Sequence, residues 1–105
     1  MTEEPVERIL TVDRIDGGLR IRGQVDLSNV DRFREALATA TPNASVLVID
    51  LSECSYMGSE GIGALIETVR SLGRGRLVLR SPSGIIHKVL DLSGLGKLAN
   101  VEISA

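Results

Sequence analysis

The order of two hydrophobic periods constrains the fold of this chain more than any other feature. The run SVLVIDL (45–51) is almost continuously apolar, as expected of a strand buried on both faces. The segment that follows carries an apolar stripe at helical spacing, at Ile62, Leu65, Ile66, Val69 and Leu72. RLVLR (76–80) is then a second buried strand. A strand, a helix and a strand in this order predict two parallel strands joined by a right-handed crossover.

The flanking segments extend this pattern in both directions. RILTVDRI (8–15) and LRIRG (19–23) alternate around Asp16-Gly17-Gly18, which predicts an antiparallel hairpin near a margin of the sheet. Ser28 is the expected N-cap of a helix that ends at Thr41-Pro42. The last elements are a helix at 83–92 and a strand at 101–103. We therefore predict an α/β domain with a mostly parallel sheet of four to five strands, an antiparallel N-terminal hairpin and helices packed against the sheet.

Length and composition exclude several classes of function. At 105 residues the chain is long enough for one domain, in which we expect residues 1–7 to be flexible. The net charge of −2 and the presence of only two aromatic residues argue against nucleic acid as a partner. No apolar stretch approaches the roughly 20 residues of a membrane span, and the acidic N-terminus does not have the plan of a signal peptide. Cys54 is the only cysteine, which excludes an internal disulfide and a cysteine-based metal site. These features indicate a cytoplasmic protein.

The turn YMGSEGIG (56–63) is the most informative local motif. Sites in parallel sheets gather where strand ends meet helix starts, and this turn and the loop 24–28 are both such places. Its glycines have the spacing G-x-x-G-x-G, which is not the dinucleotide fingerprint. A nucleophile elbow needs a serine centred between glycines and an available histidine, whereas His87 is the only histidine and lies on another helix. Two interpretations remain: Ser59 is a helix N-cap, or the turn is a surface that another protein binds.

Three segments resemble one known family. DLSECSYMGSEGIGALIETVR (50–70) resembles the signature of STAS domains, the family of anti-sigma factor antagonists, in which a strand ending in D-L-S precedes D-S-x-G-[LI]-x-x-L. GQVDLSNVDRFREAL (23–37) and VLDLSGLGKLANVEI (89–103) are similar to the first helical segment and the closing segment of that family. The resemblance covers about residues 18 to 104, and it implies a single STAS-like domain.

The resemblance implies a switch controlled by phosphorylation. Ser59 matches the serine that a partner kinase phosphorylates, and Asp26 matches an aspartate of the neighbouring loop. In that family the unphosphorylated protein binds an anti-sigma factor, which is a serine kinase that uses ATP, and so releases the sigma factor. Serine phosphorylation switches this binding off. The partner-binding surface implied by the resemblance consists of Asp26, Leu27, Ser28, Asn29, Ser55, Tyr56, Met57, Gly58, Glu60, Gly61 and Ile62. A phosphatase is a further partner that such a switch allows, and the chain itself needs no cofactor or metal.

The chain departs from the family pattern at two positions beside Ser59. Gly58 replaces the aspartate before the serine, and Glu60 follows the serine where a small residue is common. The chain also ends soon after its last strand, without the C-terminal helix usual in the family, which favours a homodimer. The alternative role is that of a STAS regulatory subunit or domain of a lipid or anion transport system, or of a scaffold that does not switch. A small phosphoryl-transfer enzyme is a second alternative. The sequence offers no catalytic histidine, cysteine pair or carboxylate cluster in support of that alternative, so we do not expect an enzyme.

Overall fold

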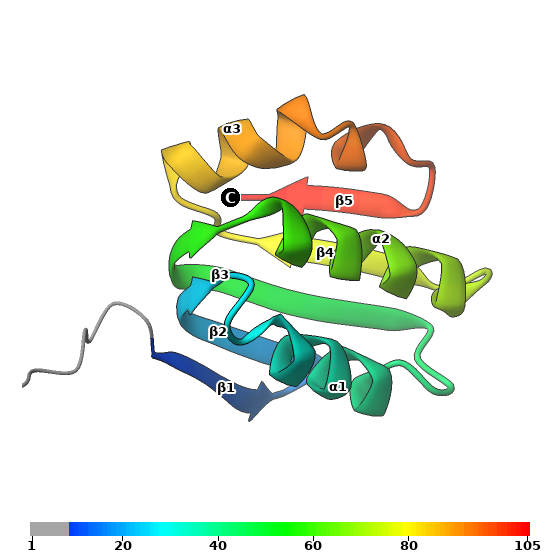
Figure 1. Cartoon of the computed structure of the whole chain (residues 1–105). Coiled ribbons are helices and arrows are strands. Elements are labelled where there is room, and N and C mark those ends of the chain that lie inside the picture. Colours follow the sequence, from blue (N-terminus) through cyan, green and yellow to red (C-terminus); the bar gives the residue numbers. More distant parts are fainter. Residues whose placement is uncertain (1–8) are drawn as a thin grey trace, which may run out of the picture.

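The computed structural model describes residues 9–105, which form one five-stranded sheet and its helices. The elements in chain order are β1 (Leu10–Ile15), β2 (Gly18–Val25), α1 (Val30–Ala40), β3 (Val46–Met57), α2 (Ser59–Leu72), β4 (Arg76–Arg80), α3 (Gly84–Leu92), the 3-10 helix η2 (Leu95–Lys97) and β5 (Val101–Ser104). The strands lie side by side in the order β1-β2-β3-β4-β5, and of these pairs only β1–β2 is antiparallel (Figure 1). The predicted fold class is confirmed. Residues 1–7, expected to be flexible, and the first residue of the predicted strand 8–15 lie outside the described residues.

The hairpin between β1 and β2 depends on two glycines. Gly17 has φ +82°, a conformation that side chains disfavour, and its carbonyl accepts a hydrogen bond from the backbone N–H of Val48 at 2.9 Å. At Gly18 a Cβ atom would lie 1.7 Å from the carbonyl oxygen of Val48. The start of β2 can therefore lie against β3 only because Gly18 has no side chain.

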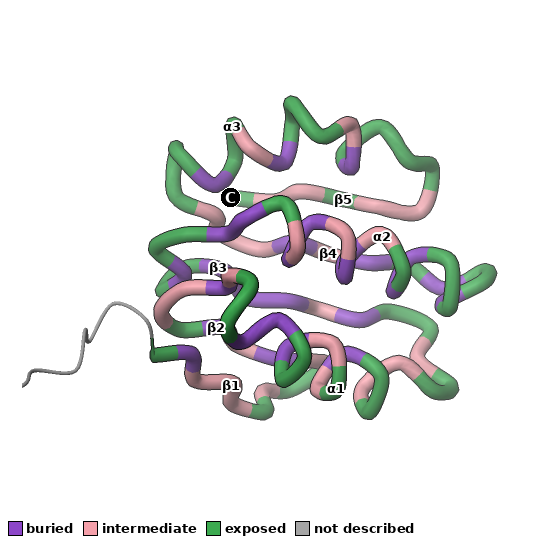
Figure 2. The backbone as a smooth tube through the Cα atoms, in the orientation of Figure 1, coloured by how far each residue is buried: buried purple, intermediate pink, exposed green. Residues whose placement is uncertain are grey.

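The helices cover one face of the sheet and leave the other face open. Alternate residues of the central strands point to the helices and are fully buried, among them Ile21, Ile49 and Leu79. They pack with Phe33 of α1 and Leu65 of α2 in one aliphatic core. Figure 1 shows the helices on a single side of the sheet. In Figure 2 buried residues alternate with half-buried or exposed ones along the central strands, as expected when only one face is covered. The molecule thus has two layers, one of helices and one of strands.

The prediction that the central strands are buried on both faces is wrong. Val46 of β3 is 44% exposed, and Val48 and Val78 are only half-buried, because they point to the open face. Valine is common in strands because its branched side chain suits the pleated sheet, even where one face is exposed to solvent. The continuous apolar run therefore does not indicate that both faces of the sheet are covered. β3 is the central strand, and β2 and β4 each lie one strand from an edge.

Several predicted element ends differ from the structure, and three of these differences lie at or beside the turn 56–63 and the loop 24–28. β3 continues to Met57, six residues beyond the predicted end at position 51. The N-cap of α1 is Asn29 and not Ser28, whose hydroxyl bonds to Asp26 instead. The N-cap of α2 is Gly58, so the interpretation of Ser59 as the cap is also wrong. Within residues 9–105, no helix has the length and apolar character needed to cross a membrane.

Candidate functional site

Two loops meet at the end of the sheet where β2 and β3 finish. The two strands are parallel, and their last residues Val25 and Met57 are paired. The backbone N–H of Gly58 donates to the carbonyl of Val25 at 2.9 Å. This bond holds the start of α2 beside the loop 26–29, so the structure brings together the two segments that the sequence singled out.

The loop 26–29 is held by its own polar side chains. One carboxylate oxygen of Asp26 accepts hydrogen bonds from the backbone N–H of Ser28 at 3.0 Å and from its hydroxyl at 2.5 Å. The Asn29 side chain, in a residue only 8% exposed, accepts from the N–H of Asp26 at 3.0 Å and donates to the carbonyl of Gln24 at 2.9 Å. Leu27 projects outward and is 75% exposed. The side-chain hydrogen bonds therefore hold the loop in a conformation that exposes the apolar side chain of Leu27.

The start of α2 presents Ser59 to solvent. Gly58 has φ −78° and ψ 175°, and its carbonyl accepts hydrogen bonds from the backbone N–H groups of Gly61 and Ile62. Ser59 is the first residue of the helix and is exposed. A Cβ atom on Gly61 would lie 2.8 Å from Cγ of Met57, so this glycine allows the first turn to pack closely against the end of β3.

The predicted partner-binding residues separate into two groups by exposure. Those that face solvent are Leu27, Ser28, Ser55 and Tyr56 together with Ser59, while Asp26 and Glu60 are half-buried. Those that are buried are Asn29, Met57, Gly58, Gly61 and Ile62. The buried five are therefore placed to shape the surface rather than to touch a partner.

The charge around Ser59 is negative. Residues 26–29 and 55–62 contain two carboxylates, those of Asp26 and Glu60, and no lysine or arginine. The Glu60 side chain lies back over Gly58, where a Cβ atom would be 2.6 Å from Oε1 of Glu60 and 3.2 Å from the hydroxyl of Tyr56. An acidic group thus lies immediately beside the exposed serine.

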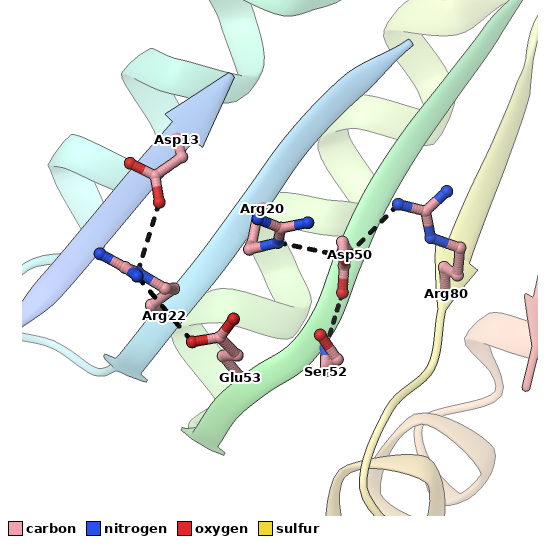
Figure 3. A network of polar contacts seen from close by, with 7 residues as sticks. All are labelled: Asp13, Arg20, Arg22, Asp50, Ser52, Glu53 and Arg80. Atoms are coloured by element: carbon pink, nitrogen blue, oxygen red, sulfur yellow. Dashed lines mark hydrogen bonds and ion pairs between the residues drawn. The ribbon is translucent and has the colours of Figure 1, made fainter. Parts of the chain in front are cut away.

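Asp50 is a key residue whose role the sequence did not reveal. It belongs to the D-L-S motif, yet it lies on the open face of the sheet, where its side chain is only 8% exposed (Figure 3). Its carboxylate pairs with Arg20 of β2 and Arg80 of β4, each at 3.3 Å, and accepts the backbone N–H of Ser52 at 2.8 Å. The three central strands are therefore linked through one carboxylate. A charged residue within an apolar run was the signal that could have indicated this.

The environment of Asp50 changes its pKa. Burial by itself raises the pKa of the carboxyl group, but hydrogen bonds from the N–H and hydroxyl of Ser52, and from Arg80 and Arg20, together outweigh that effect. The pKa falls from 3.8 to about 2. Asp50 is therefore ionised at every pH at which the protein is expected to work.

Cys54 has the opposite environment. Burial raises the pKa of its thiol to about 11, against a smaller opposing effect of a hydrogen bond with the backbone of Tyr56. The thiol is therefore protonated and unreactive at neutral pH. Among residues 9–105, no group of three or more histidine, cysteine, aspartate or glutamate side chains is arranged to hold a metal ion.

Comparison with known families identifies the class of domain. A family model described as "Mlab, STAS domain" matches residues 10–101. The chain belongs to the STAS domain family. Its curated STAS relatives include the anti-sigma F factor antagonist of Lysinibacillus sphaericus, 33% identical over 82 residues that cover 74% of this chain and 70% of that protein. They also include the anti-sigma-B factor antagonist of Listeria monocytogenes, 30% identical over 93 residues that cover 86% and 80%.

Several solved structures share the fold described above. The anti-sigma factor antagonist SpoIIAA in its unphosphorylated form is 25% identical, with a TM-score of 0.71 over 92% of this chain and 89% of that one. The phosphorylated form of Bacillus SpoIIAA is 26% identical, with a TM-score of 0.64 over 92% of each chain. A chain of the Acinetobacter MlaFEDB complex has a TM-score of 0.69 over 89% of this chain and 99% of that one, but at 18% identity this shows a shared fold alone.

Proposed function

We propose that this STAS domain is an anti-sigma factor antagonist controlled by phosphorylation of Ser59. Its unphosphorylated form binds an anti-sigma factor that is also a serine kinase, and this binding releases the sigma factor. The observation that carries the proposal is the exposed position of Ser59 at the first residue of α2, beside the loop 26–29, in a chain with anti-sigma factor antagonists among its relatives. The kinase uses ATP, so the proposal places the protein in the cytoplasm.

Ser59 is a better acceptor than the other serines of this surface. The hydroxyl of Ser28 donates to the Asp26 carboxylate, and that of Ser55 donates to the carbonyl of Gly23 at 3.2 Å. Ser59 instead lies at the positive end of the α2 dipole, where an exposed negative group stabilises the helix by roughly 0.3–1 kcal/mol. A phosphate there should leave the fold intact, which is supported by the likeness of this chain to both forms of SpoIIAA.

The same phosphate should weaken the complex. A kinase holds the γ-phosphate of ATP in line with the acceptor hydroxyl, so the new phosphoserine faces the phosphates of ADP after transfer. The phosphoryl group adds a charge of about −1.5 to −2 to a surface that already carries Asp26 and Glu60. Like charges would then have to be desolvated together at the interface. Phosphorylation thus acts on binding and spares the fold, and a phosphatase acting on Ser59 would reset the switch.

The proposal is tested with Ser59→Ala and with Ser71→Ala, a control at an exposed serine near the end of the same helix. Each variant is incubated with ATP and the purified anti-sigma kinases of the source organism. Phosphate is located by mass spectrometry, and affinity is measured by calorimetry. We expect Ser59→Ala to bind but to remain unphosphorylated, and Ser71→Ala to behave as the wild type. Normal phosphorylation of Ser59→Ala would overturn the assignment of Ser59.

A second candidate role has a specific observation in its favour. The matching family model carries the description "Mlab", and Gly58 stands where the family pattern given above has an aspartate before the serine. The domain would then be a STAS subunit of a lipid or anion transport system, in which phosphorylation plays no part. Co-purification from a detergent-treated lysate of whole cells separates the two roles, because a transport assembly would accompany the chain in one case and an anti-sigma factor in the other.

A further inference from the structure

Two side chains converge on Gly58 from opposite directions along the chain. A Cβ atom at this residue would lie 2.6 Å from Oε1 of Glu60 and 3.2 Å from the hydroxyl of Tyr56. The Glu60 carboxylate therefore occupies the space that a side chain at position 58 would fill, although Glu60 follows Ser59 in sequence. Tyr56 is 49% exposed, Ser59 is exposed and Glu60 is half-buried, so solvent reaches all three residues.

The Glu60 carboxylate is available to a partner. In the part of the chain that the structure describes, no cation pairs with it, whereas Asp50 and Asp13 on the open sheet face are paired with arginines. The other acid of the surface, Asp26, already accepts two hydrogen bonds from Ser28. Glu60 is thus the acid beside Ser59 that an incoming group can contact without breaking an internal bond.

We propose that Glu60 is a recognition residue for the anti-sigma kinase and binds an arginine of that partner. A guanidinium group can make two parallel hydrogen bonds with a carboxylate, and it can stack on an aromatic ring. The carboxylate of Glu60 and the ring of Tyr56 offer both contacts within a few ångströms of Gly58, which has no side chain to obstruct the approach. The inference rests on the proposed function and adds the chemistry of recognition to it.

The first experiment compares Glu60→Gln with Glu67→Gln. Glu67 is an exposed glutamate two turns further along α2, paired with Arg34. Affinity for the anti-sigma kinase that phosphorylates Ser59 is measured by calorimetry at low and high salt. We expect Glu60→Gln to weaken binding by about tenfold or more and to reduce its salt dependence, because a charge-assisted pair is lost. Glu67→Gln should change affinity by less than about twofold.

The second experiment moves the acid instead of removing it. Gly58 has φ −78°, so an aspartate is accommodated there without backbone strain. In Gly58→Asp/Glu60→Ala the shortened side chain of residue 60 leaves this space to the aspartate carboxylate, and we expect most of the affinity lost in Glu60→Ala to return. Gly58→Asn/Glu60→Ala has the same shape without the charge, and its affinity should stay as low as that of Glu60→Ala.

The outcomes separate this inference from the function on which it rests. Wild-type affinity for Glu60→Gln, or a loss that the transposed aspartate does not recover, overturns the role of Glu60 alone. A wild-type chain that neither binds nor is phosphorylated by any of the purified anti-sigma kinases overturns the proposed function, and the role of Glu60 with it.

Discussion

Asp50 allows a quantitative test of how the sheet is held together. Its carboxylate lies between Arg20 and Arg80 on neighbouring strands, and its side chain is 8% exposed. Replacing it in Asp50→Asn keeps the shape and removes the charge. The two guanidinium groups then face each other across a neutral amide, so we expect the folded state to lose stability.

The pKa of Asp50 sets the size of the expected loss. A carboxyl group whose pKa is 3.8 in the unfolded chain and about 2 in the folded one binds its proton more weakly when folded. Each pKa unit corresponds to about 1.36 kcal/mol, so the ionised group stabilises the folded state by about 2 kcal/mol at neutral pH. This contribution is complete above about pH 5. It is lost as the pH falls from about 4 to below 2, where the carboxyl group is protonated in both states.

Urea unfolding of Asp50→Asn and the wild type, followed by circular dichroism, measures this difference. With a typical slope of about 1–3 kcal/mol per molar urea, the midpoint at pH 7 should fall by roughly 1 M. The gap between the two proteins should shrink to roughly 1 kcal/mol at pH 3 and close almost fully near pH 2. Asp13→Asn is the matched control, because Asp13 pairs with Arg22 on the same face but is 42% exposed. Its effect should be only a few tenths of a kcal/mol.

Two results would refute this account of Asp50. Equal stability of Asp50→Asn and the wild type at pH 7 would mean that the cost of burying the carboxylate cancels its pairing. A loss of the same size at pH 7 and at pH 2 would mean that the shape or hydrogen bonding of the side chain matters and its charge does not.

Four further substitutions test the packing and hydrogen bonds around Ser59, each by denaturant or thermal unfolding. Gly61→Ala should lower the free energy of unfolding by about 1–3 kcal/mol, because its Cβ would lie 2.8 Å from Cγ of Met57. Gly63→Ala has no atom within 4 Å of its Cβ, so it should stabilise α2 by up to about 1 kcal/mol. The opposite order of the two effects would contradict the packing of the first turn. Asn29→Ala should lower the free energy of unfolding by about 1–3 kcal/mol, because the N–H of Asp26 and the carbonyl of Gln24 lose their partner. An unchanged urea midpoint would show that water replaces the side-chain amide. Gly58→Asp should melt no lower than the wild type, since aspartate is a favourable N-cap at this φ, and a lower melting temperature would show that Glu60 and Tyr56 cannot move aside.

The order of the elements was predictable because it depends on local patterns. The change from alternating to helical spacing, the Asp16-Gly17-Gly18 turn and the cap at Ser83, whose hydroxyl accepts the N–H of Ile86, act within a few residues of the chain. The length of β3 was not predictable in this way. Beyond Leu51 its residues are mostly polar, and they stay in the sheet because they pair with β2 through two register shifts. Such pairing depends on the fold as a whole, so the hydrophobic pattern of β3 by itself does not indicate it.

The coverage of the sheet was the second feature that local patterns could not give. A run of valine, leucine and isoleucine has the same appearance whether helices cover one face or two. Asp50 was the residue that argued against a strand covered on both faces by apolar side chains, because an ionised carboxylate inside a strand requires polar partners. Those partners, Arg20 and Arg80, are each 30 residues away in sequence. The D-L-S motif therefore contributes a link between strands, while the residues that follow it shape the surface around Ser59.

The one-residue difference in the cap of α2 matters for function. A serine at an N-cap uses its hydroxyl to accept a backbone N–H, as Ser83 does in α3. Gly58 takes the cap position in α2, so Ser59 falls on the first helical residue and its hydroxyl is not used to close the helix. An aspartate at position 58 would leave the serine equally free and would add a carboxylate beside it. Here the side chain of Glu60 brings a carboxylate to that same space. The departure at Gly58 therefore changes which residue supplies the charge and leaves the position of Ser59 as the proposed switch requires.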